Sequence, residues 1–188
     1  MRNKISKLVF FIGLSLVSIV LISKIYTNNI ENKAINSFKE KINSSQNEKE
    51  EFLKKEIKIG DEIALIDIEK IDVHSVIVEG SSLEVLKHNI GHFENTAMPG
   101  DAGNFGIAGH RNNINNEVFR NIDKLEVGDK IKITTIEKAF EYEVDDILVI
   151  SPEEVEVLSQ NIEKKEMTIV TCTNRGKDRH IVRAKLVS

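Results

Sequence analysis

Residues 167–187 read MTIVTCTNRGKDRHIVRAKLV, two apolar runs separated by a polar and basic loop. Short runs rich in Val, Ile and Thr that are bounded by turn residues are typical of β-strands. This stretch therefore predicts strands at residues 167–172 and 180–187. Cys172 falls at the end of the first strand, next to the loop.

The same pattern extends back to about residue 57, with short apolar runs punctuated by turn residues. The further expected strands lie at residues 62–80 (two or three strands), 104–110, 130–135 and 139–150. Ser81 and Glu84 form a possible capping box for a short helix, and a helical turn is expected at 117–125. Seven or eight strands without long intervening helices predict a mainly antiparallel closed barrel or sandwich.

Length and composition limit the other possibilities. The 188 residues suffice for one domain and an appendage. With 26 Lys and Arg against 30 Asp and Glu, the net charge of -4 offers no basic footprint, so no nucleic-acid partner is expected. A single Cys excludes a disulfide framework and a Cys-rich zinc module.

The N-terminal region contains a candidate membrane segment. Residues 8–23, LVFFIGLSLVSIVLIS, hold no charged residue and follow Arg2, Lys4 and Lys7. As a helix this run would span about 24 Å against a hydrocarbon core of roughly 30 Å, and Lys7 and Lys24 could snorkel at the two faces. The alternative is a cleaved signal peptide, but no small-x-small cleavage site is visible. We expect an uncleaved transmembrane anchor.

Flanking charge predicts the topology and the domain organisation. By the positive-inside rule, residues 1–26 form a cytoplasmic tail and anchor of a single-pass cell-membrane protein, and the rest lies outside the cell. Residues 27–55 are expected to be a partly helical linker, with a helical part of the core as the alternative. Residues 56–188 form the folded domain. The part beyond the anchor holds 22 of the basic and all 30 acidic residues, so it is acidic.

Cys172 is the first candidate for chemistry. A lone thiol in an extracytoplasmic domain is either intermolecular or reactive, whereas the alternative is a buried, inert Cys. Its neighbours in the loop include Arg175, Lys177 and Arg179. This electropositive, accessible strand end is the setting in which reactive cysteines occur.

His110 is the candidate base, because it ends the apolar run NFGIAGH and precedes a polar stretch. The competing histidines are His74, His88, His92 and His180. A metal site built from Cys172, His110 and nearby carboxylates has no paired ligand spacing to support it.

These segments together resemble the sortase family. TIVTC, with an Arg seven residues after its Cys, is similar to the TLxTC signature of sortases, and PGDAGNFGIAGHRNN is similar to the segment that carries their histidine. EIALIDIEKIDVHSVIVEG and FRNIDKLEVGDKIKI occur in the family's order, so the resemblance covers roughly residues 57–188. It implies a closed eight-stranded sortase-type β-barrel with a few short helices, preceded by a transmembrane helix.

The resemblance also implies roles at matching positions. Cys172 would be the nucleophile, His110 the general acid/base, and Arg179 the cation that steadies the substrate carbonyl or oxyanion. Thr171 would line the substrate site, and Val170 stands in the variable position of the signature.

Two details qualify the match. Arg175 and Arg183 are rival arginines, but Arg179 directly precedes the closing strand, as in the family. The only prolines are Pro99 and Pro152, so the Asp-Pro-aromatic lid motif of pilin-polymerising sortases is absent. The compact pattern favours class D, with class A next.

The implied activity is transpeptidation at the cell surface. The partners would be surface proteins with a C-terminal LPxTG-like sorting signal, an amine of a peptidoglycan precursor, and the membrane through the N-terminal helix. The alternatives are a membrane-anchored cysteine peptidase and a non-catalytic surface-binding barrel. No cofactor is expected; the acids in residues 151–166 could bind calcium, but a solvated loop explains them equally well.

Overall fold

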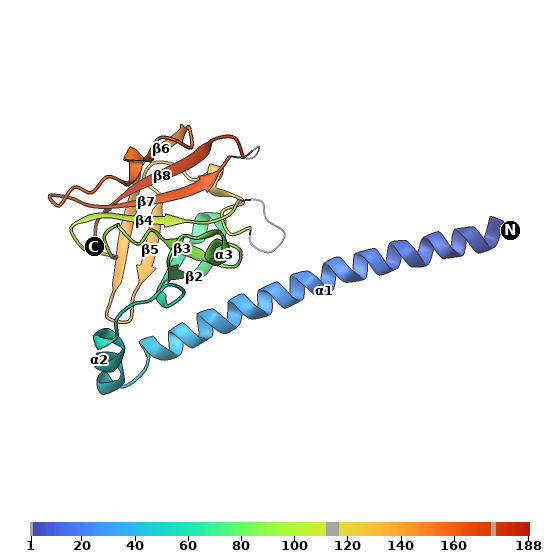
Figure 1. Cartoon of the computed structure of the whole chain (residues 1–188), viewed down its shortest axis with the longest axis horizontal. Coiled ribbons are helices and arrows are strands. Elements are labelled where there is room, and N and C mark those ends of the chain that lie inside the picture. The colour runs from blue at the N-terminus through green and yellow to red at the C-terminus, as the bar shows by residue number, and fades with distance from the viewer. Residues whose placement is uncertain (1, 112–116, 174–175) are drawn as a thin grey trace.

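A closed barrel of β-strands makes up the folded body of the molecule (Figure 1). The computed structural model describes residues 2–111, 117–173 and 176–188. Within these residues the eight strands follow the order β1-β2-β3-β4-β7-β8-β6-β5 around the barrel. Their bounds are β1 Glu62–Ile68, β2 Val73–Glu79, β3 Ile90–His92, β4 Gly103–Ala108, β5 Lys130–Thr134, β6 Ala139–Ile150, β7 Lys165–Cys172 and β8 Arg179–Leu186. The prediction of a mainly β, closed eight-stranded barrel is confirmed.

The barrel is mixed rather than purely antiparallel. β2 pairs with β3, and β4 with β7, in parallel, whereas the other neighbouring strands are antiparallel. The β4–β7 ladder runs from Gly103↔Lys165 to Ala108↔Val170. Parallel neighbours need a long crossover, which here contains β5 and β6. The crossover brings the His110 and Cys172 segments side by side.

Alternation along the strands separates an inner face from an outer face. The inward side chains on β4, β7 and β8 include Phe105, Ile107, Met167, Ile169, Val182 and Ala184, which all belong to the main buried cluster. Because successive side chains of a strand point to opposite faces, Ala108, Val170 and Cys172 lie on the outer face. The outer face of the β4–β7 pair therefore carries the chemistry predicted from the sequence.

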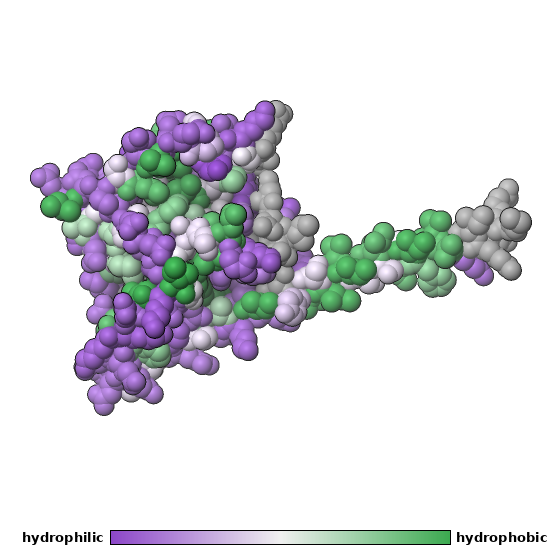
Figure 2. Space-filling view, viewed as in Figure 1, coloured by the Kyte–Doolittle hydropathy of each residue, from purple (hydrophilic) through white to green (hydrophobic). Residues whose placement is uncertain are grey.

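The long helix α1, Arg2–Ile42, carries the apolar run as an arm that projects from the barrel (Figure 1). Its large apolar side chains stand exposed along the arm, with Phe10 66% and Phe11 63% accessible (Figure 2). Among the described residues this is the one helix long and apolar enough to cross a membrane, by length and composition. The expected N-terminal apolar helix is present; its insertion into a membrane stays a prediction.

The C-terminal part of α1 packs on the barrel. Ile35 and Phe38 are buried with Leu65 of β1 and with Val76 and Val78 of β2. This packing favours the alternative weighed for residues 27–55, a helical extension of the core, over a free linker as far as the end of α1. The following helix α2, Gln46–Lys54, buries no residue.

The other helices are short. α3 is Leu83–Leu86, and the 3-10 helices are η1 Glu69–Ile71, η2 Ile122–Lys124 and η3 Val155–Leu158. The N-cap of α3 is Ser82, whose Oγ accepts a hydrogen bond from Val85 N at 3.4 Å, and not the expected Ser81. The strand β3 was not predicted, because three residues are too few for a periodic signal.

Candidate active site

Cys172 is the last residue of β7, a half-buried free thiol on the outer face. In the antiparallel β7–β8 pair it lies directly opposite Arg179, the first residue of β8. Opposed residues in such a pair have Cα atoms about 5 Å apart and point to the same face. The thiol and the guanidinium therefore share one end of the barrel's outer face.

His110 reaches the same end from the other side of β7. β4 ends at Ala108, which is level with Val170, and the ladder continues as Gly109 N donates to Val170 O at 3.2 Å. Two residues beyond Ala108, His110 is level with Cys172 and half-buried. The register thus pairs Cys172 with Arg179 on one side of β7, and on the other side His110 follows β4 two residues after the Ala108–Val170 pair, with neighbouring strands about 5 Å apart.

The backbone can take this path from β4 to His110 because residue 109 is a glycine and has no side chain. A Cβ added at Gly109 would lie 2.6 Å from Phe119 Cε2 and 3.1 Å from Val118 Cγ1. Phe119 N in turn donates to His110 O at 3.1 Å. The chain after β4 is therefore packed tightly against the segment that starts η2, and this packing sets where His110 begins to leave the sheet.

The signature residues before Cys172 divide between the two faces. Thr171 is 3% exposed and points inward, where its Oγ1 donates to Gly109 O at 2.7 Å. Val170 is half-buried on the outer face, two residues from the thiol. A substrate contact is thus open to Val170, whereas the Thr171 hydroxyl supports the backbone next to His110; the substrate-lining role of both stays a prediction.

The rival arginines are separated from the thiol or not described. Arg183 lies opposite Thr168, four residues along β8 from Arg179, and pairs with Glu166 Oε2 at 3.6 Å. Four strand residues span about 13 Å. Arg175 and the polar stretch 112–116 lie outside the described residues.

Three of the other histidines are away from this end or already paired. His92 is buried, and its Nδ1 lies 2.8 Å from Glu79 Oε2. His74 contacts Asp67 on the neighbouring strand. His88 is exposed after α3. Among the described residues, no hydrogen bond or ion pair joins any of the three to Cys172 or Arg179.

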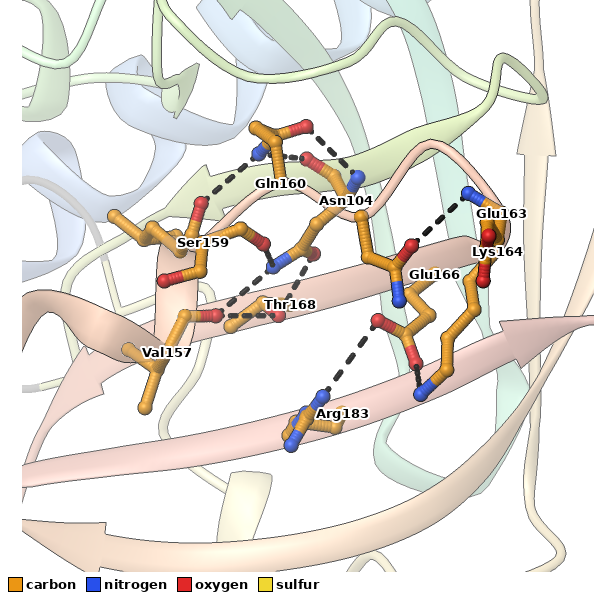
Figure 3. A network of polar contacts seen from close by, with 11 residues as sticks. Asn104, Val157, Ser159, Gln160, Glu163, Lys164, Glu166, Thr168 and Arg183 are labelled. Carbon is orange, nitrogen blue, oxygen red and sulfur yellow. Dashed lines mark hydrogen bonds and ion pairs between the residues drawn. The ribbon is translucent and has the colours of Figure 1, made fainter.

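A polar network fixes the loop between β6 and β7 onto the outer face (Figure 3). Asn104 of β4 is 1% exposed; its Nδ2 donates to Val157 O at 2.9 Å and its Oδ1 accepts from Thr168 Oγ1 at 2.9 Å. Gln160 Oε1 accepts from Asn104 N at 2.9 Å, and its Nε2 donates to Asn104 O at 3.0 Å. The loop covers Thr168, whereas Val170 and Cys172 further along β7 are half-buried.

Sequence reasoning missed a buried charged group behind the site. Arg111 is 5% exposed and its Nη2 lies 2.8 Å from Asp123 Oδ1. His180, next to Arg179, faces inward opposite Thr171 and is 9% exposed. Burial, and secondly the charge of Arg111, lower the pKa of His180 below its ordinary value. For His180 the sequence signal was its position, since period-2 alternation in β8 turns the residue after Arg179 inward. Arg111 lies beyond the end of β4, so alternation gave no signal for it.

A metal role for these residues gains no support from their arrangement. Among the described residues, no group of three or more His, Cys, Asp or Glu side chains is placed to hold a metal ion. The acids of residues 151–166 are on the loop of Figure 3 and around η3.

A closed mixed barrel with Cys172 and Arg179 paired at one end, and His110 just beyond the strand on the other side of β7, agrees with the fold and the residue order expected for the sortase family. The chain belongs to the sortase family: the family model described as a sortase domain matches residues 66–187. The resemblance found in the sequence is thereby confirmed.

Relatives include several classes of sortase. A solved structure of a Clostridium perfringens sortase D5 transpeptidase is 66% identical, with a TM-score of 0.78, and covers 85% of this chain and 99% of that one. Sortase SrtE1 of Streptomyces coelicolor is 43% identical over 68% of this chain and 41% of its own length. Sortase D of Bacillus subtilis is 27% identical over 60% of this chain and 55% of its length. The chain thus matches only about half the length of these two curated relatives.

Proposed function

We propose that the protein is a membrane-anchored cysteine transpeptidase that cleaves an LPxTG-like sorting signal and joins the released surface protein to an amine of a cell-wall precursor. The observation that carries this proposal is that Cys172 ends β7 opposite Arg179 at the start of β8, while His110 follows the end of β4, the strand on the other side of β7. Membership of the sortase family supports the same chemistry. The 66% identity to a sortase D5 transpeptidase favours class D.

In the first half-reaction, Cys172 Sγ attacks the carbonyl carbon of the signal's Thr. Arg179 stabilises the negative charge that develops on the carbonyl oxygen. As the Thr–Gly bond breaks, His110 gives a proton to the departing Gly amine, leaving the acyl group on sulfur as a thioester. In the second half-reaction an acceptor amine attacks the thioester, His110 takes its proton, and Cys172 Sγ departs from the carbonyl carbon as a thiolate, so that His110 recovers the proton that it gave up in the first half-reaction. The chain itself supplies every group in this scheme, so no step is assigned to a cofactor.

Membrane anchoring gives the α1 arm a function. The apolar run would insert in the bilayer with the basic N-terminus in the cytoplasm, so the barrel would lie outside the cell. In Figure 1, β7 runs toward the side on which the N-terminal half of α1 projects, so its Cys172 end would face the membrane. Confining the enzyme with membrane-tethered substrates raises their effective concentration near the thiol.

The deciding experiment uses the full chain in detergent or vesicles with a panel of LPxTG-like peptides and amine acceptors, with products identified by mass. We expect an amine-dependent ligation product from the wild type and none from Cys172→Ala. Hydrolysis alone, unaffected by any amine, would identify a cysteine peptidase. The absence of any product with every peptide, or turnover retained in Cys172→Ala, would reject the proposed chemistry.

Topology is tested separately. Protease added to intact protoplasts should digest the barrel, while the mature chain should keep its N-terminal residues. A protected barrel would contradict the orientation, and a mature N-terminus near residue 25 would contradict the uncleaved anchor.

A further inference from the structure

Arg111 is a buried cation immediately after the proposed acid/base His110. Its side chain is 5% exposed, and Asp123, whose side chain is 53% exposed, is its ion-pair partner at 2.8 Å. Asp123 lies in η2, twelve residues further along the chain. The pair therefore closes the base of the loop that leaves β4 after His110.

The backbone on either side of His110 is held by three hydrogen bonds. Gly109 N donates to Val170 O at 3.2 Å, Thr171 Oγ1 donates to Gly109 O at 2.7 Å, and Phe119 N donates to His110 O at 3.1 Å. The first two bonds tie His110 to β7, the strand that carries the thiol. The third ties it to the segment leading into η2, which the Arg111–Asp123 pair also anchors.

Each proposed catalytic residue has a buried polar or charged neighbour in the sequence. These neighbours are Arg111 beside His110, Thr171 beside Cys172, and His180 beside Arg179. Among the described residues, Arg111 Nε and His180 Nε2 are buried atoms without a hydrogen-bond partner. A buried guanidinium with one ion pair and an unsatisfied Nε is costly to hold, so local packing alone gives no reason for an Arg at this position.

We propose that Arg111, held by Asp123, is a positioning residue that fixes the His110 imidazole where it can protonate the departing amine, without itself touching substrate. The inference rests on the proposed transpeptidase function. Arg111 acts on the backbone that follows His110, and a loosened loop would let the imidazole leave the level of Cys172. The rate of proton transfer to the departing amine should fall most, because this step depends on the position of the imidazole to within a fraction of an ångström.

The test compares two acyl donors with the same peptide. One ends in the natural amide bond, whose amine leaving group needs a proton; the other is a thioester, whose thiolate leaves without one. For Asp123→Asn and Arg111→Met we expect the turnover number on the amide to fall about 10- to 100-fold, as for lost general-acid catalysis, with KM little changed. On the thioester, the single-turnover rate of acyl-enzyme formation should stay within about threefold of the wild type, because a thiolate leaves without needing a proton from His110 and the later attack of the acceptor amine is not part of this measurement.

Matched variants define the controls. Arg120 pairs with Glu117 at 2.9 Å in the same segment, but both side chains are exposed, so Arg120→Ala should leave both activities unchanged. Asp123→Glu keeps the charge and should recover most of the amide activity. Asp123→Asn preserves the shape of a half-exposed side chain. If Arg111→Met does not fold, Asp123→Asn alone therefore tests whether the ion pair positions His110.

The outcomes separate the two proposals. Parallel loss of amide and thioester activity, or full amide activity in Asp123→Asn, overturns the positioning role. A wild-type enzyme that fails on both donors rejects the transpeptidase function itself. Selective loss on the amide, with Arg120→Ala normal, supports Arg111 as the positioning residue.

Discussion

Cys172 and Arg179 are direct cross-strand partners, the last residue of β7 and the first residue of β8. The connection between them is closed by Thr173 N donating to Asp178 O at 3.0 Å, which keeps the hairpin in this register. β6 supports the same position, since Ile150 lies opposite Arg179 on its other side. The register therefore fixes the backbone of Arg179 directly opposite that of Cys172, a constraint that a residue on a free loop would not have.

The role of Arg179 is tested by comparing it with Arg183, which shares its strand and its outer face. Arg179→Ala should lower the rate of acyl-enzyme formation by about 100- to 1,000-fold, as for loss of an oxyanion donor. Arg179→Lys should stay strongly impaired, because an ammonium group lacks the planar fork of donors. Arg183→Ala, which removes only a half-exposed ion pair with Glu166, should be close to the wild type. The measurement is the single-turnover rate of thioester formation. A large loss of this rate in Arg183→Ala, with a wild-type rate in Arg179→Ala, would reverse the assignment.

The docking of α1 on the barrel is tested at Phe38, which is fully buried against β1 and β2. Phe38→Ala should cost about 3 kcal/mol of the free energy that holds this part of α1 to the barrel. Hydrogen exchange of the amides in residues 30–42 should accelerate accordingly. Phe52→Ala on α2 is the control, because that ring is 40% exposed. Unchanged exchange in Phe38→Ala would mean that residues 27–55 behave as the free linker that the sequence first indicated.

The attachment of the β6–β7 loop to the outer face of the barrel is tested at Asn104. Asn104→Ala leaves the Val157 carbonyl and the Thr168 hydroxyl without their partner, which should cost about 2–3 kcal/mol. Amides of residues 155–160 should exchange faster, and KM for the sorting peptide should rise. Asn161→Ala is the matched control, since Asn161 is exposed and caps only Glu163 N at 3.0 Å. Equal effects of the two changes on exchange would argue against the Asn104 network as the element that holds the loop.

The pH dependence of stability should depend in part on His180. Burial first, and then the charge of Arg111, lower the pKa of His180 from its ordinary 6.5, while Asp123 opposes this shift. Just below pH 6.5 the unfolded chain then binds more protons here than the folded chain does. The free energy of unfolding should therefore fall as the pH is lowered through that window.

His180→Gln removes the titrating group and should flatten this part of the profile, measured by urea unfolding at a series of pH values from 7.5 down to 5. His88→Gln, a change at an exposed histidine, should keep the wild-type slope. An identical slope in His180→Gln and the wild type would show that other groups carry the acid sensitivity.

Local sequence pattern was enough to predict the strands and to propose which residues carry the chemistry. Period-2 apolar runs were enough to predict β1, β2, β4 to β8 and the β5–β6 hairpin, because alternation is a local property of half-buried strands. The Cys172, His110 and Arg179 assignments came from motif resemblance, which records residue type and order along the chain. The long apolar run before Lys24 likewise needed no tertiary information.

Tertiary structure decided which residues face one another. The parallel β4–β7 pairing joins segments about sixty residues apart, and only that long crossover makes His110 level with Cys172. The same holds for the burial of Phe38 on the barrel and for the Arg111–Asp123 ion pair, since neither contact follows from the strand pattern of the residues that make it. The apolar pattern of a strand predicts which of its side chains point inward and which point outward. The register between strands decides which residues become neighbours. A register shift of β7 by one residue would move Cys172 to the other face of the sheet. The catalytic arrangement is thus a consequence of strand register, which is fixed by the packing of the whole barrel.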